Sequence, residues 1–338
     1  MTSLPHGRLN DSYGRSVNYI RLSVTDRCNL RCLYCFNKEN AYYIPHPKIL
    51  SYEEMTRVVR ICERLGVNKV RLTGGEPLVR KNFLHFVEML KESSPSVALR
   101  LTTNATLLAD KLDALKDLGL MRLNISLDTL DRDKFQSITG RDFLPRVLTA
   151  VDRAVSKGFR VKINAVALKG VNDGELFDFI NLARNFPIDV RYIEFMPMGG
   201  CSRWSFENFW SANDILASAK SMADLVPAST ESAESRGPAK MYEIKGGLGR
   251  FGLITPLSHH FCRTCNRLRL TSDGKLRTCL FSDKEYRLRS LLRSPRINDD
   301  MIAKVIAKAN TRKPLGFEIL DKRGRSPVAQ KQMSSIGG

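Results

Sequence analysis

The sequence lacks an apolar run long enough to cross a membrane. A spanning helix needs about 20 consecutive apolar residues, and no stretch of the chain approaches that length. The first residues also lack the apolar segment of a secretory signal peptide. We therefore expect no membrane partner and a reducing compartment, which is the cytoplasm or, for a eukaryotic source, the mitochondrial matrix.

Acidic residues are too few to balance the basic ones. The chain carries 35 Asp and Glu against 54 Lys and Arg, a formal net charge of +19 at pH 7. A surplus of this size implies a polyanionic partner. Nucleic acid is the simplest candidate, whereas a phosphorylated small molecule would engage only a few of the cations. Charge alone does not decide between them.

The eight cysteines are clustered along the chain. Clustering in a chain without a secretory signal favours metal binding over disulfides. Cys201 stands apart, and Cys62 lies on the apolar stripe of an expected helix, where we predict a core residue. The other cysteines form the first cysteine group, Cys28, Cys32 and Cys35, and the second cysteine group, Cys262, Cys265 and Cys279.

From residue 17 onward, strand patterns alternate with helix patterns. Repeated strand–helix units of this length predict a parallel sheet with right-handed crossovers. Period-2 alternation predicts strands at 17–24, 67–73, 97–103, 121–128, 160–168 and 190–196. Period-3.6 patterns predict helices at about 51–65, 82–92, 107–118, 143–157 and 173–186, with a short one at 131–138.

One face of nearly every expected strand is polar, and several of its residues are cations. Lys69 and Arg71, for example, alternate with Val70 and Leu72. Strands that are covered by helices on both faces read instead as continuous apolar runs. We therefore predict an α/β fold, a partial (β/α)6 TIM-type barrel with a ligand-filled interior and an active site at the C-terminal ends of the strands.

The last expected strand complicates this pattern. Glu194 and Met196 are its predicted polar face, opposite Ile193 and Phe195. Arg191 shares the spacing of Ile193, so a bulge or a contact beyond the barrel would be needed to bring it to the site.

The first cysteine group follows the first expected strand on a short loop. Three thiolates can hold three irons of a four-iron cluster and leave the fourth iron without a protein ligand. Zinc also binds paired cysteines, but structural zinc usually has four ligands, and this loop supplies no fourth. The spacing, with Tyr34 before the last cysteine, resembles the cluster loop of radical S-adenosylmethionine (SAM) enzymes, whose open iron binds SAM.

Two further motifs add to this resemblance. Glycines after a strand usually serve backbone geometry alone, but Gly74-Gly75-Glu76-Pro77 resembles the superfamily's GGEP motif, which contacts the methionine part of SAM. Three thiolates of the second cysteine group could hold a second cluster whose open iron binds substrate. The alternative is a zinc site completed by His259 or His260.

Arg267 and Arg269 are placed at strand spacing beside the second cysteine group. Both guanidinium groups should point the same way, toward phosphate oxygens or a nucleobase edge. Without the cysteines, a solvated basic strand would be an equal interpretation. The terminal Gly337 and Gly338 could thread into a crowded site or simply fray.

In order along the chain, these motifs resemble the GTP 3′,8-cyclase family of molybdenum cofactor biosynthesis (molybdenum cofactor biosynthesis protein A). The match runs from about Asp11 to the last glycine. Two residues depart from the family pattern, Phe36 in place of methionine and Ala105 in place of glycine, and we expect only local packing differences there. The quoted motifs are TGGEPL at 73–78, NISLD at 124–128, EFMP at 194–197 and FCRTCNRLRLTSDGKL at 261–276.

The resemblance implies two [4Fe-4S] clusters, one on each cysteine group, with SAM at the first. It assigns no side chain as general acid or base. The implied SAM-binding residues are Tyr34, Gly75, Glu76, Ser126 and Met196. The implied GTP-binding residues are Arg21, Lys69, Arg71, Thr102, Lys162, Arg191, Arg267, Leu268 and Arg269, and Gly337 and Gly338 would enter the site.

The implied activity is that of a radical SAM lyase that joins C3′ of the ribose to C8 of the guanine in GTP. Its implied partners are GTP, a low-potential electron donor and a downstream cyclic pyranopterin synthase, with no nucleic acid, and a homodimer is one candidate assembly. Two alternatives stay open: a peptide-modifying radical SAM enzyme with an auxiliary cluster, and a zinc-dependent nucleic-acid-binding protein.

The expected segments are a lead-in at 1–16, the barrel at 17–210, a connecting helix and linker at 211–250, the auxiliary-cluster region at 251–325 and a flexible tail at 326–338.

Overall fold

The computed structural model describes most of the chain. Predictions that concern Phe36, Cys201, Gly337 and Gly338 lie outside the described residues. The described ranges are 7–35, 43–199, 204–229, 237–323, 328–329 and 333–336.

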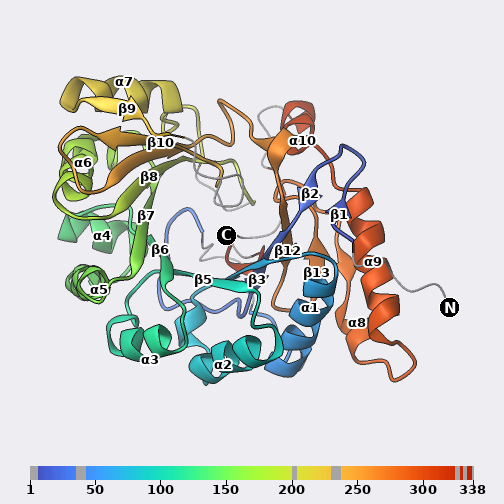
Figure 1. The fold of residues 1–338 in the computed structure, drawn as a ribbon. Helices are drawn as coiled ribbons and strands as arrows, with labels where there is room; N and C mark the ends of the chain where they lie inside the picture. Colours follow the sequence, from blue (N-terminus) through green and yellow to red (C-terminus); the bar gives the residue numbers. More distant parts are fainter. Residues whose placement is uncertain are drawn as a thin grey trace.

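The strands of the first half form the predicted partial barrel (Figure 1). All six are parallel to their neighbours, in sequence order. They are β3 (Tyr19–Ser23), β4 (Lys69–Thr73), β5 (Ala98–Thr103), β6 (Arg122–Ser126), β7 (Arg160–Ala167) and β8 (Asp189–Glu194).

The crossover helices lie outside the ring of strands (Figure 1). The first of them begins with a capping box, in which the Ser51 side chain accepts from the Glu54 amide and the Glu54 side chain accepts from the Ser51 amide. Where helices were expected from residues 107 and 173, 3-10 turns come first, η3 (Ala109–Lys111) and η4 (Asp173–Glu175). The helices are α1 (Tyr52–Arg64), α2 (Phe83–Ser93), α3 (Leu112–Asp117), α4 (Arg132–Thr139), α5 (Leu144–Ser156) and α6 (Leu176–Asn185).

The C-terminal part of the chain extends this sheet at both edges. β11 (Arg250–Ile254) pairs in parallel with β8, and β12 (Arg267–Leu270) pairs in parallel with β3. The chain therefore leaves one edge of the barrel and joins the other, so residues 255–266 connect the two edges. Antiparallel strands complete the edges: β10 (Ala239–Ile244), β9 (Leu225–Pro227), β13 (Lys275–Arg277) and β14 (Tyr286–Arg287).

The described part of the expected lead-in is ordered. β1 (Leu9–Asn10) and β2 (Ser16–Val17) form a hairpin that contacts α9 (Asp299–Thr311). Leu9 and Val17 are buried there, which explains why the hairpin holds its place. The remaining helices are α7 (Ala212–Met222), α8 (Arg289–Leu292), α10 (Gly316–Arg323) and α11 (Met333–Ile336).

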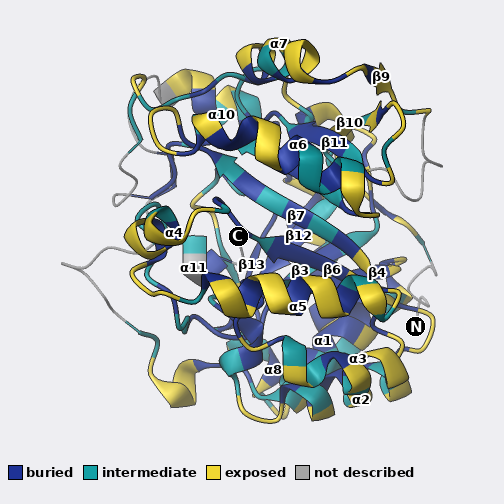
Figure 2. Cartoon of the chain, turned by 90° about the vertical axis from the view of Figure 1, so that its left-hand side faces the viewer, coloured by how far each residue is buried: buried dark blue, intermediate teal, exposed yellow. Residues whose placement is uncertain are grey.

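The apolar core lies between the sheet and its outer helices, and the exposed residues of the helices face outward (Figure 2). Along β7, buried residues alternate with half-buried ones, which is the predicted two-faced pattern. Cys62 is fully buried in this core, which confirms its predicted role. Among the described helices, none is both long and apolar enough to cross a membrane.

Ala105, one of the two departures from the family pattern, has a left-handed backbone with φ 61°. Glycine adopts this conformation freely, whereas an L-residue pays roughly 1–2 kcal/mol. The strain is held by neighbours, because the Ala105 amide donates to Thr103 Oγ1 and the Thr106 amide donates to Asn104 Oδ1.

We predict that Ala105→Gly is almost neutral for stability. Relief of the strain offsets the loss of a buried methyl, about 0.8 kcal/mol, and the greater entropy loss of glycine, about 0.5–1 kcal/mol. The matched control is Ala154→Gly, at an equally buried position inside helix α5, which should cost about 1–2 kcal/mol. Urea-unfolding midpoints measure both, and equal destabilisation at the two positions would contradict the strain.

Candidate active site

Both cysteine groups line one cavity of about 1600 Å³ inside the barrel. The first group follows the C-terminal end of β3, and two members of the second precede the N-terminal end of β12. β12 runs parallel to β3, with Arg267 opposite Tyr19. The two groups therefore approach the cavity from opposite ends of these strands.

Close backbone contact holds the first cysteine loop against the end of β4. The Gly75 amide donates to Thr25 O at 2.7 Å, and the Glu76 amide donates to Arg27 O at 2.8 Å. A Cβ at Gly75 would lie 2.2 Å from Arg27 O, so this approach requires glycine.

The Glu76 carboxylate joins the ends of β4 and β5. Its oxygens accept from the Asn104 amide at 2.6 Å, the Thr103 hydroxyl at 2.8 Å and the Leu78 amide at 3.0 Å. Burial raises the pKa of Glu76 to about 7, against the lowering effect of these bonds. Asn104 in turn donates to Cys28 Sγ at 3.7 Å and to Asn29 at 2.9 Å. Glu76 thereby fixes a residue that contacts the first cysteine group.

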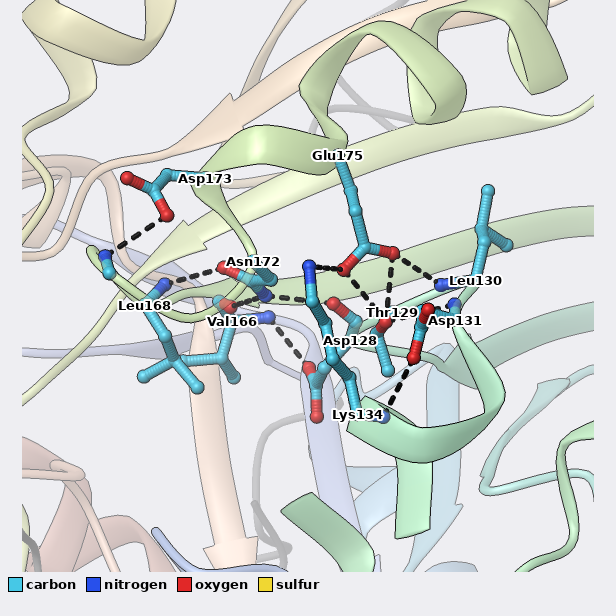
Figure 3. Close-up of polar contacts among 11 residues, drawn as sticks. Asp128, Thr129, Leu130, Asp131, Lys134, Val166, Leu168, Asn172, Asp173 and Glu175 are labelled. Carbon is cyan, nitrogen blue, oxygen red and sulfur yellow. Dashed lines mark hydrogen bonds and ion pairs between the residues drawn. The ribbon is translucent and has the colours of Figure 1, made fainter. Parts of the chain in front are cut away.

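A polar network around Asp128 also fixes Tyr34, the aromatic residue of the first loop; Figure 3 shows the part of this network that Asp128, Val166 and Asn172 form. The Tyr34 hydroxyl donates to Asp128 Oδ2 at 2.5 Å, while Asp128 Oδ1 accepts from the Val166 amide at 2.8 Å. Asn172 Nδ2 donates to the carbonyls of both Asp128 and Val166, each at 2.8 Å. Burial raises the pKa of Asp128 to about 6, although Tyr34 and Val166 oppose the shift. The ends of β6 and β7 therefore hold the cysteine loop through one carboxylate.

A buried arginine from the N-terminal hairpin holds the second cysteine group. Arg15 donates to the carbonyls of Cys262 and Lys313, each at 2.8 Å, and pairs with Asp11 at 2.5 Å. Sequence reasoning assigned no role to Arg15, because its partners lie in distant parts of the chain.

The donor geometry favours iron–sulfur clusters over zinc. Among the described residues, no three His, Cys, Asp or Glu side chains are close enough to hold a single metal ion. A four-iron cluster does not need such closeness, because each of its thiolates binds a different iron. The two histidines have other partners: His259 Nε2 contacts Asn213 Oδ1 at 3.0 Å, and His260 Nδ1 contacts Pro256 O at 2.7 Å. The cysteines therefore fit the two predicted clusters better than a zinc site.

Four arginines stand side by side between the two cysteine groups. Strand register places Arg269 beside Arg21, Arg21 beside Arg71, and Arg71 beside Arg100, and all four line the cavity. We call these residues the arginine row. Unit charges about 5 Å apart repel by about 3 kcal/mol at an effective dielectric constant of 20. The row is therefore a strong site for a polyanion.

The positive charge of the arginine row lowers the pKa of Tyr19. Burial raises that pKa, but Arg71 and Arg21 outweigh burial and lower it to about 8. Arg71 also donates to the Tyr19 hydroxyl at 2.5 Å.

Arg191 reaches the cavity without a bulge, so the predicted need for a bulge or a contact beyond the barrel was wrong. Its backbone is in register with Asn164 on β7, and its side chain lines the cavity. Tyr192 points the other way and packs edge-to-face on Phe179 and Trp210. The Asp189, Arg191 and Ile193 face is therefore the inner one.

Glu194, at the C-terminal end of β8, also lines the cavity and connects other segments. Its carboxylate accepts from the amides of Ala212 at 3.0 Å, Leu257 at 2.9 Å and Ser258 at 3.0 Å. It therefore anchors the start of the segment that connects the barrel edges.

Most residues with implied roles line the cavity. Leu268 is the exception, because it is fully buried in the core and only its backbone could meet a ligand. Arg100 and Asp128 line the cavity without a predicted role, and the two-residue strand spacing between Arg100 and Thr102 could have identified Arg100. The implied residues that line it are Tyr34, Gly75, Glu76, Ser126 and Met196, together with Arg21, Lys69, Arg71, Thr102, Lys162, Arg191, Arg267 and Arg269.

Two family models match the chain in succession. Residues 22–183 match the radical SAM superfamily, and residues 188–319 match the family described as Molybdenum Cofactor Synthesis C. The structure also resembles that of Streptococcus suis SuiB bound to S-adenosylmethionine, with a TM-score of 0.60 at 15% identity over 94% of this chain and 77% of that one. At this identity, the likeness shows the fold alone.

Relatives named GTP 3′,8-cyclase match almost the whole chain. The protein from Alkaliphilus oremlandii is 43% identical over 98% of this chain and 100% of its own length. Those from Desulforamulus reducens and Listeria monocytogenes are 42% and 39% identical, over 97% and 98% of this chain and 99% of their own lengths. The chain therefore belongs to the GTP 3′,8-cyclase family.

Proposed function

We propose that the protein is a radical SAM lyase that converts GTP into (8S)-3′,8-cyclo-7,8-dihydroguanosine 5′-triphosphate, the first step of molybdenum cofactor biosynthesis. The observation that carries this function is the single cavity that holds two cysteine triplets with an arginine row between them. Full-length similarity to proteins named GTP 3′,8-cyclase supports the same reaction. The cofactors are two [4Fe-4S] clusters and SAM.

The first cysteine group would hold one cluster, whose fourth iron binds SAM. Bound there, the cluster and SAM supply the hydrogen-abstracting radical chemistry of the superfamily. The protein's part is to orient SAM and exclude water. We assign contacts with SAM to Tyr34, Gly75, Glu76, Ser126 and Met196, which line the cavity near this group.

The cations of the inner strand faces would bind the triphosphate of GTP. Guanidinium groups suit this task because their donors match phosphate oxygens in pairs. Anchoring the triphosphate also holds C3′ of the ribose toward the first cluster, an orientation effect that lowers the barrier to reaction. Arg267 and Arg269 follow Cys265 closely in the sequence, and we assign them contacts with the guanine beside the second cluster.

Arg191 has the clearest signature of a ligand contact. Its Nε and Nη2 are buried, and neither has a hydrogen-bond partner among the described residues. Burial, with Arg71 nearby, lowers the pKa of Arg191 to about 10, so the side chain stays cationic at neutral pH. A phosphate oxygen would satisfy both donors.

The chemistry of the proposed reaction also implies further partners and a compartment. A low-potential donor must deliver electrons, and the product passes to a downstream cyclic pyranopterin synthase. We place the reaction in the cytoplasm, where the seven free cysteines of the described residues stay reduced. A homodimer stays a prediction, and we assign no general acid or base.

The two alternative functions are less well supported. A peptide-modifying enzyme would share the fold with SuiB, but it would leave the arginine row without a role. A zinc-dependent nucleic-acid-binding protein would need single-ion sites, and the described residues offer none.

We predict that the reduced protein forms 5′-deoxyadenosine from SAM in the presence of GTP. Deuterium at C3′ of GTP should appear in that product, because this hydrogen is the one abstracted. Mass spectrometry measures the label, and GTP deuterated at C4′ is the control. Label transfer from C4′, or cleavage of SAM that ignores GTP, would contradict the assignment.

The anaerobically reconstituted protein should contain about eight irons per chain, four for each cluster. Replacing Cys262, Cys265 and Cys279 together with Ser should leave about four. Colorimetric iron and sulfide assays measure both values. A wild-type value near four, or bound zinc, would remove the second cluster from the proposal.

Arg191→Ala should weaken GTP binding while leaving SAM binding intact. A hydrogen bond to a charged group contributes about 1.5–3 kcal/mol, so the GTP dissociation constant should rise roughly 10- to 100-fold. Equilibrium dialysis with each ligand measures this split. The control is Arg160→Ala, an exposed arginine at the start of neighbouring β7, and equal effects of the two variants would refute the contact.

A further inference from the structure

Lys313 is a buried lysine that binds backbone next to the second cysteine group. Its side chain is almost fully buried, at 2% exposure for the residue. Nζ donates to Arg267 O at 2.7 Å and to Thr278 O at 2.5 Å. Thr278 precedes Cys279, and Arg267 follows Cys265 by two positions, so one ammonium group connects two of the three ligand segments.

No carboxylate of the described residues balances the charge of Lys313. Among the described residues, no Asp or Glu forms an ion pair with Nζ. The other cations nearby, Arg15 and Arg267, repel it, and the groups that attract it are Cys265 and Cys279. A buried cation without an anion is strongly unfavourable. Thiolates are therefore the counter-charge for which this lysine is placed.

The residues that follow Lys313 also lie against the second cysteine group. Gly316 starts α10, and a Cβ there would lie 3.0 Å from Cys279 Sγ and 3.3 Å from Cys262 Sγ. The amides of Gly316 and Phe317 hydrogen-bond to the Cys262 sulfur. Residues 313–317 thus bring a fixed positive charge and two N–H donors against the second group.

We propose that Lys313 is a positioning residue for the second cluster, which joins two ligand segments and raises the cluster's reduction potential through its charge. This inference rests on the proposed function, because it needs a cluster at the second cysteine group. Reduction adds one negative charge to a cluster, and a buried cation nearby stabilises the reduced form more than the oxidised form. Reduction potentials of iron–sulfur clusters follow such local charge and hydrogen bonding.

The test separates the charge of Lys313 from its hydrogen bonds. Lys313→Gln keeps N–H donors and removes the charge, whereas Lys313→Arg keeps both. Lys308→Gln removes the same charge from an exposed position on α9 and is the matched control. All are made in the full chain with Cys28, Cys32 and Cys35 changed to Ser, so that only the second cluster is present. Its midpoint potential is then measured by redox titration followed by electron paramagnetic resonance, together with iron content.

Lys313→Gln should make reduction about tenfold less favourable, a shift of about 59 mV to more negative potential for one electron. Lys313→Arg and Lys308→Gln should keep the potential of the parent. Loss of iron in the Gln variant alone would also support the role of the charge. An unchanged potential in Lys313→Gln with iron retained, or loss of iron in both Gln and Arg variants, would overturn it. A parent protein without iron would instead remove the second cluster, and with it the proposed function and this assignment.

Discussion

The repulsion among buried and half-buried cations inside the barrel is the constraint on which the other features of the site depend. Arg269, Arg21, Arg71 and Arg100 occupy one level of four neighbouring strands. Burial lowers the pKa of Arg21 to about 10, and the neighbouring Arg71 and Arg267 contribute to this shift. The scaffold must supply enough apolar burial to hold such a row, and the core between sheet and helices provides it. A bound triphosphate would turn this unfavourable arrangement into binding affinity.

Strand alternation explains how much of this site could be predicted from sequence. On β4, Lys69 and Arg71 alternate with the apolar Val70 and Leu72, so the sequence identified Lys69 and Arg71 as the inner face of the strand. β8 misled the same reasoning, because polar residues occur at both spacings: Arg191 and Glu194 both line the cavity, while Tyr192 is buried against outer residues. Alternation shows that a strand has two faces. It identifies the inner face only where one of the two is plainly apolar.

Contacts between distant segments set the limit of sequence reasoning. Arg15 and Lys313 are far apart in the chain and far from the cysteines that they support, yet Arg15 donates to the carbonyls of both Cys262 and Lys313. The cysteine spacing predicted the ligands, but no local pattern predicts which buried cations satisfy the carbonyls behind them. Asp128 could be predicted only in part. The sequence identified the motif that contains it, but not its hydrogen bond to Tyr34.

The two cysteine groups differ in the charge that surrounds them, and this difference suits two different tasks. Burial raises the pKa of Cys28 to about 11, and the nearby acid Glu76 contributes to this shift. At Cys265 burial acts in the same direction, but Arg267 and Lys313 outweigh it and lower the pKa to about 6. Acids near the first group disfavour added electrons and so favour a strongly reducing cluster, which the cleavage of SAM requires. Cations near the second group favour an electron-rich cluster and an anionic substrate at its open iron. The arginine row between them would then hold the proposed substrate within reach of both centres.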